Sequence, residues 1–181
     1  MRLFAAVVPP PEAAEHLDAA VDPLRDDTLR WAGPDAWHVT LAFYGEFPND
    51  RVADLVQRLH RVASRHAPVE LSLARAGRFD GRVLWVGCTG DVGALRALAR
   101  ACGAAGRRAG ADIDEQRRFR AHLTLARSSR PVDLRPYVAA LAGYAGPAWT
   151  VTEVALVRSH LGAGLGNRPR YERVDSFDLA G

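Results

Sequence analysis

The feature that most constrains this chain is a short pattern that occurs twice, once in each half. Residues 38–43 read His-Val-Thr-Leu-Ala-Phe and residues 122–127 read His-Leu-Thr-Leu-Ala-Arg, so the two copies share four of six positions. Alternation of polar and apolar residues predicts a half-buried strand. A repeat of such a strand in opposite halves of the chain predicts two related lobes that each contribute one copy.

The alternation of side chains along a strand gives each copy a chemical face. His38 and Thr40 point to one side, while the apolar residues that alternate with them point to the other. His122 and Thr124 repeat this arrangement. The apolar side anchors each strand in its lobe. If the two strands pair about a pseudo-two-fold axis, two imidazoles and two hydroxyls surround one point.

Such an arrangement suits the cleavage of a phosphodiester bond. One group must deprotonate the attacking oxygen and another must protonate the leaving oxygen, and histidine can serve in either role near neutral pH. The threonine hydroxyls can donate hydrogen bonds to the non-bridging oxygens. One His-x-Thr pair on an amphipathic strand is weak support for this interpretation, whereas two copies with matched flanks support it strongly.

The rest of the sequence alternates between strand and helix patterns, which indicates a mixed α and β fold. Asn49 and Asp91 are candidate N-caps of two long helices, of which the first runs to about His66 and the second ends in the glycine-rich stretch 103–110. We expect strands at 3–8, 29–31, 38–44, 69–76, 82–88, 121–126, 150–158 and 171–179, and further helices at 11–20 and 134–141.

Length and composition limit the class of protein. The 181 residues suit one domain or two small fused lobes, and 48% hydrophobic with 25% charged residues exclude a disordered or fibrous chain. No apolar run approaches the roughly 18 residues of a membrane span. Two cysteines give no disulfide framework, so we expect a cytoplasmic protein. All 24 basic residues are arginine and the net charge is +3, which is compatible with a nucleic-acid partner without establishing one.

At the two motifs the sequence resembles the 2H phosphoesterase superfamily, specifically the RNA 2′,3′-cyclic phosphodiesterases that are also called 2′-5′ RNA ligases. The resemblance covers nearly the whole chain. Two positions depart from the usual pattern, because Arg120 stands where threonine is common and Ala121 where proline is common. Beyond the motifs, the resemblance rests on residues 2–6, 29–31, 82–87 and 157–161, together with Phe119 and Tyr171.

The resemblance implies an α+β fold in which residues 1–181 form one bilobal domain with pseudo-two-fold symmetry. Each lobe is expected to be an antiparallel sheet flanked by helices, with the active-site cleft between the lobes. The implied reaction is metal-independent opening of an RNA 2′,3′-cyclic phosphate to a 2′-phosphate, with no cofactor. The expected partner is RNA with such an end or a related nucleotide, and we expect a monomer that binds no membrane.

The resemblance also implies roles for individual residues. His38 is the expected proton donor and His122 the expected proton acceptor, and Thr40 and Thr124 are expected to bind the phosphate. The residues themselves leave the order of the two histidines open.

Phe43 and Arg127 lie five residues after their histidines, at matching positions of the two copies. The family supports stacking of Phe43 on the terminal base and binding of phosphate by Arg127. Strand alternation, however, places both on the face opposite the histidines. They therefore belong to the site only if a bulge or the end of the strand turns them inward.

Other functions stay open on the sequence alone. The same site could join RNA ends through a 2′-5′ linkage or cleave 2′-5′ oligonucleotides. A function of a different class is an RNA-end binding module without turnover. The roles of Arg120, Arg158, His160 and Tyr171 are not decided by the sequence.

Overall fold

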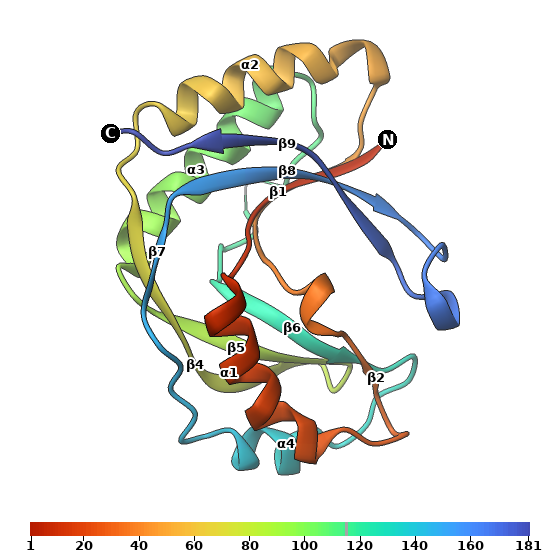
Figure 1. Ribbon diagram of the computed structural model, residues 1–181. Coiled ribbons are helices and arrows are strands. Elements are labelled where there is room, and N and C mark those ends of the chain that lie inside the picture. The colour runs from red at the N-terminus through yellow and green to blue at the C-terminus, as the bar shows by residue number, and fades with distance from the viewer. Residues whose placement is uncertain (115) are drawn as a thin grey trace.

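The protein, seen here as a computed structural model that describes residues 1–114 and 116–181, is built around a curled antiparallel sheet (Figure 1). The strands are β1 (Arg2–Val7), β2 (Arg30–Trp31), β3 (Val39–Glu46), β4 (Val69–Phe79), β5 (Val83–Gly90), β6 (His122–Arg127), β7 (Trp149–Val151), β8 (Glu153–His160) and β9 (Arg170–Asp178). The helices are α1 (Pro11–Val21), α2 (Val52–Ala63), α3 (Val92–Arg108) and α4 (Arg135–Ala140). The strand order is β7-β4-β5-β6-β3-β1-β8-β9, with β2 paired to β6.

The sheet has two halves that meet where β3 pairs with β6. The first half contains β7, β4, β5 and β6, and the second contains β3, β1, β8 and β9. Val39 of β3 lies opposite Leu123 of β6 at the junction. Helices α2 and α3 pack on the second half, while α1 and α4 lie against β4 of the first half (Figure 1). The predicted α+β class with helix-flanked antiparallel strands is confirmed, and the two halves share one continuous sheet.

The apolar stripe of α3 shows how the helices are fixed to the sheet. Asp91 caps this helix as predicted, since its carboxylate accepts a hydrogen bond of 3.2 Å from the amide of Ala94. Leu95, Leu98 and Cys102 follow at helical spacing and are fully buried. Each buried leucine contributes about 1.5–3 kcal/mol of hydrophobic stabilisation. This stripe holds α3 against β3, the strand that carries the first motif.

The helix α3 ends at Arg108, inside the glycine-rich stretch 103–110 in which the sequence predicts its end. Gly106 lies inside the helix, and an added Cβ would overlap the ring of Tyr44. The Tyr44 hydroxyl donates a hydrogen bond of 3.2 Å to the carbonyl of Cys102. The glycine therefore permits a close contact between β3 and α3, and the helix ends two residues later at Arg108.

Two expectations are wrong in detail. Asn49 begins a short 3-10 turn and makes no capping hydrogen bond, and α2 starts at Val52. The strand expected over residues 150–158 is divided at Thr152, because β7 pairs with β4 in one half and β8 pairs with β1 in the other. The remaining predicted strands and helices are present. In the part of the chain that the structure describes, no helix has the length and apolar character needed to cross a membrane.

The contact between Tyr44 and Gly106 gives a test of this packing. Gly106→Ala should lower the free energy of unfolding by about 1–3 kcal/mol, because the new methyl group must displace the ring or the helix. Gly93→Ala in the same helix is the matched control, since an added Cβ there meets no atom within 4 Å. It should be neutral or stabilise by up to about 1 kcal/mol. Urea unfolding measures both, and equal stability of the two variants would contradict the packing argument.

Candidate active site

Both His-x-Thr pairs project from one face of the sheet, at the junction of its halves. Val39 and Leu123 pair across the junction and are fully buried. Neighbouring side chains alternate, and paired residues point to the same side of the sheet. The histidine and threonine that flank each of these residues therefore share the opposite face, and all four are half-buried. Because the strands are antiparallel, each histidine lies across from the threonine of the other copy.

Each motif strand carries a bulge at the fourth position of its motif, Leu41 in β3 and Leu125 in β6. Thr40 and Ala42, on either side of Leu41, pair with consecutive residues of β1, so Leu41 is the extra residue. The same irregularity occurs around Leu125 where β6 pairs with β5. An extra residue shifts the alternation of side chains by one position. The two residues that follow the fourth motif position are therefore turned to the face opposite the one that strict alternation gives them. In β3 a second bulge follows at Tyr44.

These bulges bring Phe43 and Arg127 to the face of the histidines. Phe43 pairs with Phe4, whose ring packs against His38 with 4.7 Å between ring centroids. Its side chain is 41% exposed, and the guanidinium of Arg2 lies 4.6 Å from its ring centroid. Arg127 follows the same pattern in β6. The condition for placing both residues at the site is met, while their roles remain predictions.

The two imidazoles are oriented in the same way. Nδ1 of His38 lies 2.9 Å from the carbonyl oxygen of Ala36, and Nδ1 of His122 lies 2.6 Å from that of Arg120. A carbonyl oxygen only accepts hydrogen bonds, so each Nδ1 carries a hydrogen and donates it. Each Nε2 is then the atom that exchanges a proton, as an acceptor when the ring is neutral and as a donor when it is charged.

Aromatic residues of the second half enclose His38. Tyr171 of β9 meets its ring edge-on at 4.9 Å between centroids, and Phe4 of β1 covers it at 4.7 Å. Phe4 and Tyr171 also contact each other at 5.6 Å. Sequence reasoning missed Phe4 and left Tyr171 open, because the contacts join strands that are far apart in the chain.

A second aromatic pair lies beside His122. Phe79 meets the imidazole edge-on at 5.1 Å between centroids, and Trp85 lies at 6.0 Å. The guanidinium of Arg120 lies 5.8 Å from the Phe79 ring centroid and 5.9 Å from that of Trp85. Gly77 makes room for the indole, since an added Cβ would overlap it. Arg120, one of the departures from the family pattern, therefore extends over the aromatic wall of the second histidine.

The two histidines differ in their electrostatic surroundings. Burial lowers the pKa of His38 to about 4, and the charge of Arg127 acts in the same direction, against the backbone hydrogen bond to Ala36. Burial also lowers the pKa of His122, with Arg127 as the first of several nearby arginines that act in the same direction. Both imidazoles are therefore neutral near pH 7 in the free protein, and His38 lies deeper among apolar groups.

Other polar residues that the sequence singles out lie elsewhere or have local partners. His160 is on the β8–β9 hairpin, where its Nε2 lies 2.6 Å from a carboxylate oxygen of Glu172 across the hairpin. Arg158 is half-buried in β8. Among residues 1–114 and 116–181, no group of three or more histidine, cysteine, aspartate or glutamate side chains is arranged to hold a metal ion.

Comparison with known proteins places this arrangement in a family context. A family model described as the 2′-5′ RNA ligase superfamily matches residues 9–163. A protein named RNA 2′,3′-cyclic phosphodiesterase from Thermus thermophilus is 32% identical over 197 residues, which cover 100% of this chain and 91% of the relative. One of the same name from Geobacillus stearothermophilus is 30% identical over 156 residues and 83% of this chain. These residues cover 48% of that relative, so the chain spans about half of its length.

A solved structure shares the fold over the full length. The crystal structure of the Thermus thermophilus protein TT0787 matches with a TM-score of 0.80 at 29% sequence identity, covering 100% of this chain and 99% of the other. The curled antiparallel sheet with its flanking helices is therefore common to both.

The enclosure of His38 predicts an unusual titration. Its imidazole, followed by NMR, should show a pKa of about 4 in the folded protein. In a Tyr171→Ala variant water reaches one edge of the ring, and the pKa should rise towards 6.5, its value without burial. The unfolded chain takes up this proton at higher pH than the folded protein does. The free energy of unfolding should therefore fall by about 3 kcal/mol between pH 6.5 and pH 4.

A His38→Gln variant serves as the control for the stability measurement, because it should lack this part of the pH dependence. A pKa of His38 near 6.5 in the unsubstituted protein would contradict the proposed enclosure.

Proposed function

The chain belongs to the 2′-5′ RNA ligase superfamily, and we propose that it hydrolyses RNA 2′,3′-cyclic phosphate ends to 2′-phosphomonoesters. The observation that carries the proposal is the matched pair of imidazoles. Each has its Nδ1 fixed by a backbone carbonyl, while its Nε2 has no hydrogen-bond partner among the residues that the structure describes, and both rings lie on the face that also holds both threonine hydroxyls. The names of the relatives support the cyclic phosphate as substrate. Residues 1–181 would act as one bilobal domain and as a monomer.

The reaction needs two proton transfers at opposite ends of the phosphorus centre. Nε2 of His122 takes a proton from water as the water oxygen bonds to phosphorus. The P–O3′ bond breaks, and Nε2 of His38 gives its proton to O3′. The 2′-oxygen keeps the phosphate, and the proton taken from water replaces the one given to O3′ when the two imidazoles return to their starting states. Each transfer is worth about 10²–10⁴-fold in rate.

The groups around the histidines suit a charged phosphate and a base. Thr40 and Thr124 can donate hydrogen bonds to the non-bridging oxygens, where negative charge must be stabilised. Arg127 shares this face and can pair with the same oxygens. Phe43 exposes 41% of its surface, and one side of its ring is covered by Arg2, which leaves the other for the terminal base.

The proposal also assigns which histidine acts as the acid and which as the base. The family resemblance supports His38 as the acid and His122 as the base. Burial in the free protein favours the opposite order, because a group whose pKa is about 4 is a poor source of protons at pH 7. The order with His38 as acid therefore requires the bound phosphate to raise the pKa of His38. Joining of RNA ends through a 2′-5′ linkage would use the same displacement of O3′ at the same site, with the 5′-hydroxyl of a second RNA in place of water as the attacking group. The family description supports testing for it.

The main test maps the product of a defined substrate. Pure protein, incubated with an oligoribonucleotide ending in a 2′,3′-cyclic phosphate, should leave a 2′-phosphate at an unchanged rate in excess chelator, because the two imidazoles supply both proton transfers. His38→Ala and His122→Ala should each lower kcat by about 10²–10⁴-fold. His16→Ala, an exposed histidine on α1 that bonds to Tyr144, is the control and should keep full activity.

Loss of turnover in chelator, or full turnover of His122→Ala, would contradict the two-histidine mechanism. Tight binding of the cyclic end with no turnover would instead identify an RNA-end binding module.

A substrate with sulfur in place of O3′ separates the acid from the base. A thiolate leaves without a proton, so this substrate does not need the acid. His38→Ala should therefore recover a rate within about tenfold of the unsubstituted protein, while His122→Ala should stay slow by about 10²–10⁴-fold. Single-turnover rates on the oxygen and sulfur substrates provide the measurement. The reverse pattern would assign the acid to His122.

A further inference from the structure

A groove lined by arginines lies between α2 and α3, away from the motif histidines. It has a volume of about 360 Å³, and Arg58, Arg61 and Arg65 of α2 and its C-terminal extension face Arg108 at the end of α3. Ala101 and Ala104 contribute to its lining, and no aspartate or glutamate among residues 1–114 and 116–181 does. We refer to this feature as the arginine groove. The charged side chains of its lining are all arginines, and one of them, Arg58, pairs with the carboxylate of Asp54. The alanine surface leaves space between the guanidinium groups.

The three arginines of the α2 side form a line. Arg58 and Arg61, three residues apart, share one face of α2. Arg65 lies in the turn that follows the end of α2 at Ala63 and lines the same groove. Arg61 and Arg65 are exposed, and Arg58 pairs with Asp54 at 2.9 Å. A row of positive charges fits a chain of phosphates better than it fits one isolated anion.

Stabilisation of the helix ends does not account for the array. A cation in the last turn of a helix interacts favourably with the helix dipole, and Arg61 and Arg108 occupy such positions. Arg58 lies further from the end of α2, and the effect falls off within one turn. Bringing like charges from two helices to one groove is unfavourable, so a bound anion would relieve a repulsion that the fold itself creates.

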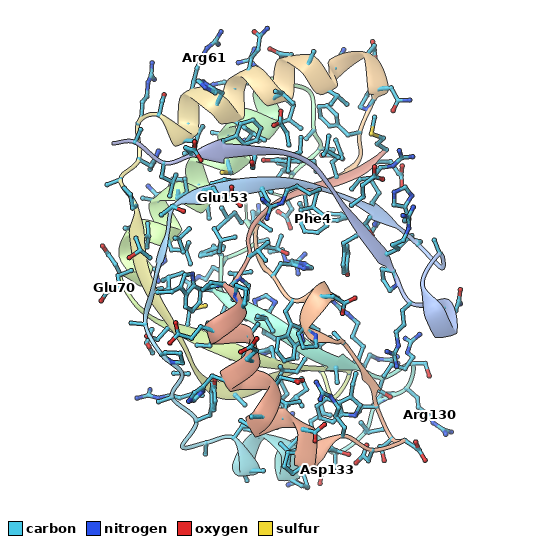
Figure 2. All side chains as sticks on the ribbon, in the orientation of Figure 1. Phe4, Arg61, Glu70, Arg130, Asp133 and Glu153 are labelled. Atoms are coloured by element: carbon cyan, nitrogen blue, oxygen red, sulfur yellow. The ribbon has the colours of Figure 1, made fainter. Side chains whose placement is uncertain are left out.

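The groove and the motif histidines lie on opposite faces of the second half of the sheet. Tyr44 of β3 packs on α3, whereas Phe43 and His38 lie on the other face of this half. Figure 2 shows Arg61 at the outer side of α2 and Phe4, which contacts His38, nearer the middle of the molecule. An RNA whose end occupies the catalytic site would reach the arginine groove only with nucleotides beyond that end.

We propose that the arginine groove binds the phosphodiester backbone of RNA outside the catalytic site. The inference rests on the proposed function for the identity of the polyanion, and the groove itself takes no part in hydrolysis. It assigns to α2 and α3 a role in holding longer RNA, through charge and without base contacts. Affinity for RNA should then depend on length and salt, while the reaction at a mononucleotide should not involve the groove.

The test compares two double variants that remove the same charge. In Arg61→Gln/Arg65→Gln, the Kd for a 20-nucleotide RNA with a 3′-hydroxyl should rise at least about tenfold at 50 mM salt, and the salt slope of log Kd should fall by about 1.4. Fluorescence anisotropy measures both. Arg96→Gln/Arg100→Gln, two exposed arginines of α3 outside the groove lining, is the matched control and should change Kd less than twofold.

Two further measurements test whether the groove binds RNA through positive charge alone and whether it takes part in catalysis. Arg61→Lys/Arg65→Lys should keep Kd within about threefold, because phosphate contacts tolerate either cation. For a nucleoside 2′,3′-cyclic phosphate, kcat/KM of Arg61→Gln/Arg65→Gln should equal that of the unsubstituted protein. The RNA with a 3′-hydroxyl has no bond to cleave, so binding tests the groove even if the proposed hydrolysis fails.

An unchanged Kd in Arg61→Gln/Arg65→Gln, or an equal loss in the control, would overturn the proposal. Full displacement of the RNA by 10 mM inorganic phosphate at constant ionic strength would also overturn it, because it would identify a site for a single anion.

Discussion

Val39 and Leu123 pair across the junction of the two sheet halves with both side chains fully buried, and the rest of the site is set by that pairing. Their burial fixes which face of each motif strand looks into the core. Because side chains alternate along a strand, the histidines and threonines must then lie on the opposite face. An antiparallel pair with this register also sets each imidazole beside the hydroxyl of the other copy. A hydrophobic contact thereby positions four polar groups on the other face of the sheet.

The bulges at Leu41 and Leu125 are the second constraint, and they act in both halves alike. Without them, strict alternation would bury Phe43 and Arg127 on the core side, where a guanidinium would be costly. With them, the residue five positions after each histidine joins the polar face, and Tyr44 is returned to the core against α3. The two motif strands therefore match in backbone conformation beyond the residues that the two copies share. The two side chains placed by it differ, one aromatic and one cationic, so equivalent backbone positions offer different contacts.

Local sequence patterns predict most elements and the shared face of the two histidines and two threonines, because helical spacing and strand alternation are both properties of one short segment. Features that depend on partners remote in the chain were not accessible in this way. The division at Thr152 follows from which strands β7 and β8 pair with, and the need for glycine at position 106 follows from its contact with the ring of Tyr44. Phe4 carries no polar group and no motif, yet it encloses His38. The sequence could not show whether the motif strands contain bulges, because a single extra residue hardly changes the pattern of polar and apolar residues.

Under the proposed function, the charge of the substrate completes the site. Burial and Arg127 hold His38 neutral in the free protein, with a pKa of about 4, which favours the neutral ring by about 3 kcal/mol. A phosphate anion about 4 Å away attracts an imidazolium by about 4 kcal/mol at the effective dielectric constant of a protein surface. The two magnitudes are comparable, so a bound cyclic phosphate can return the pKa of His38 to the neutral range. His38 would then gain its proton as the substrate binds, while Arg127 turns from a group that repels that proton into one that holds the phosphate.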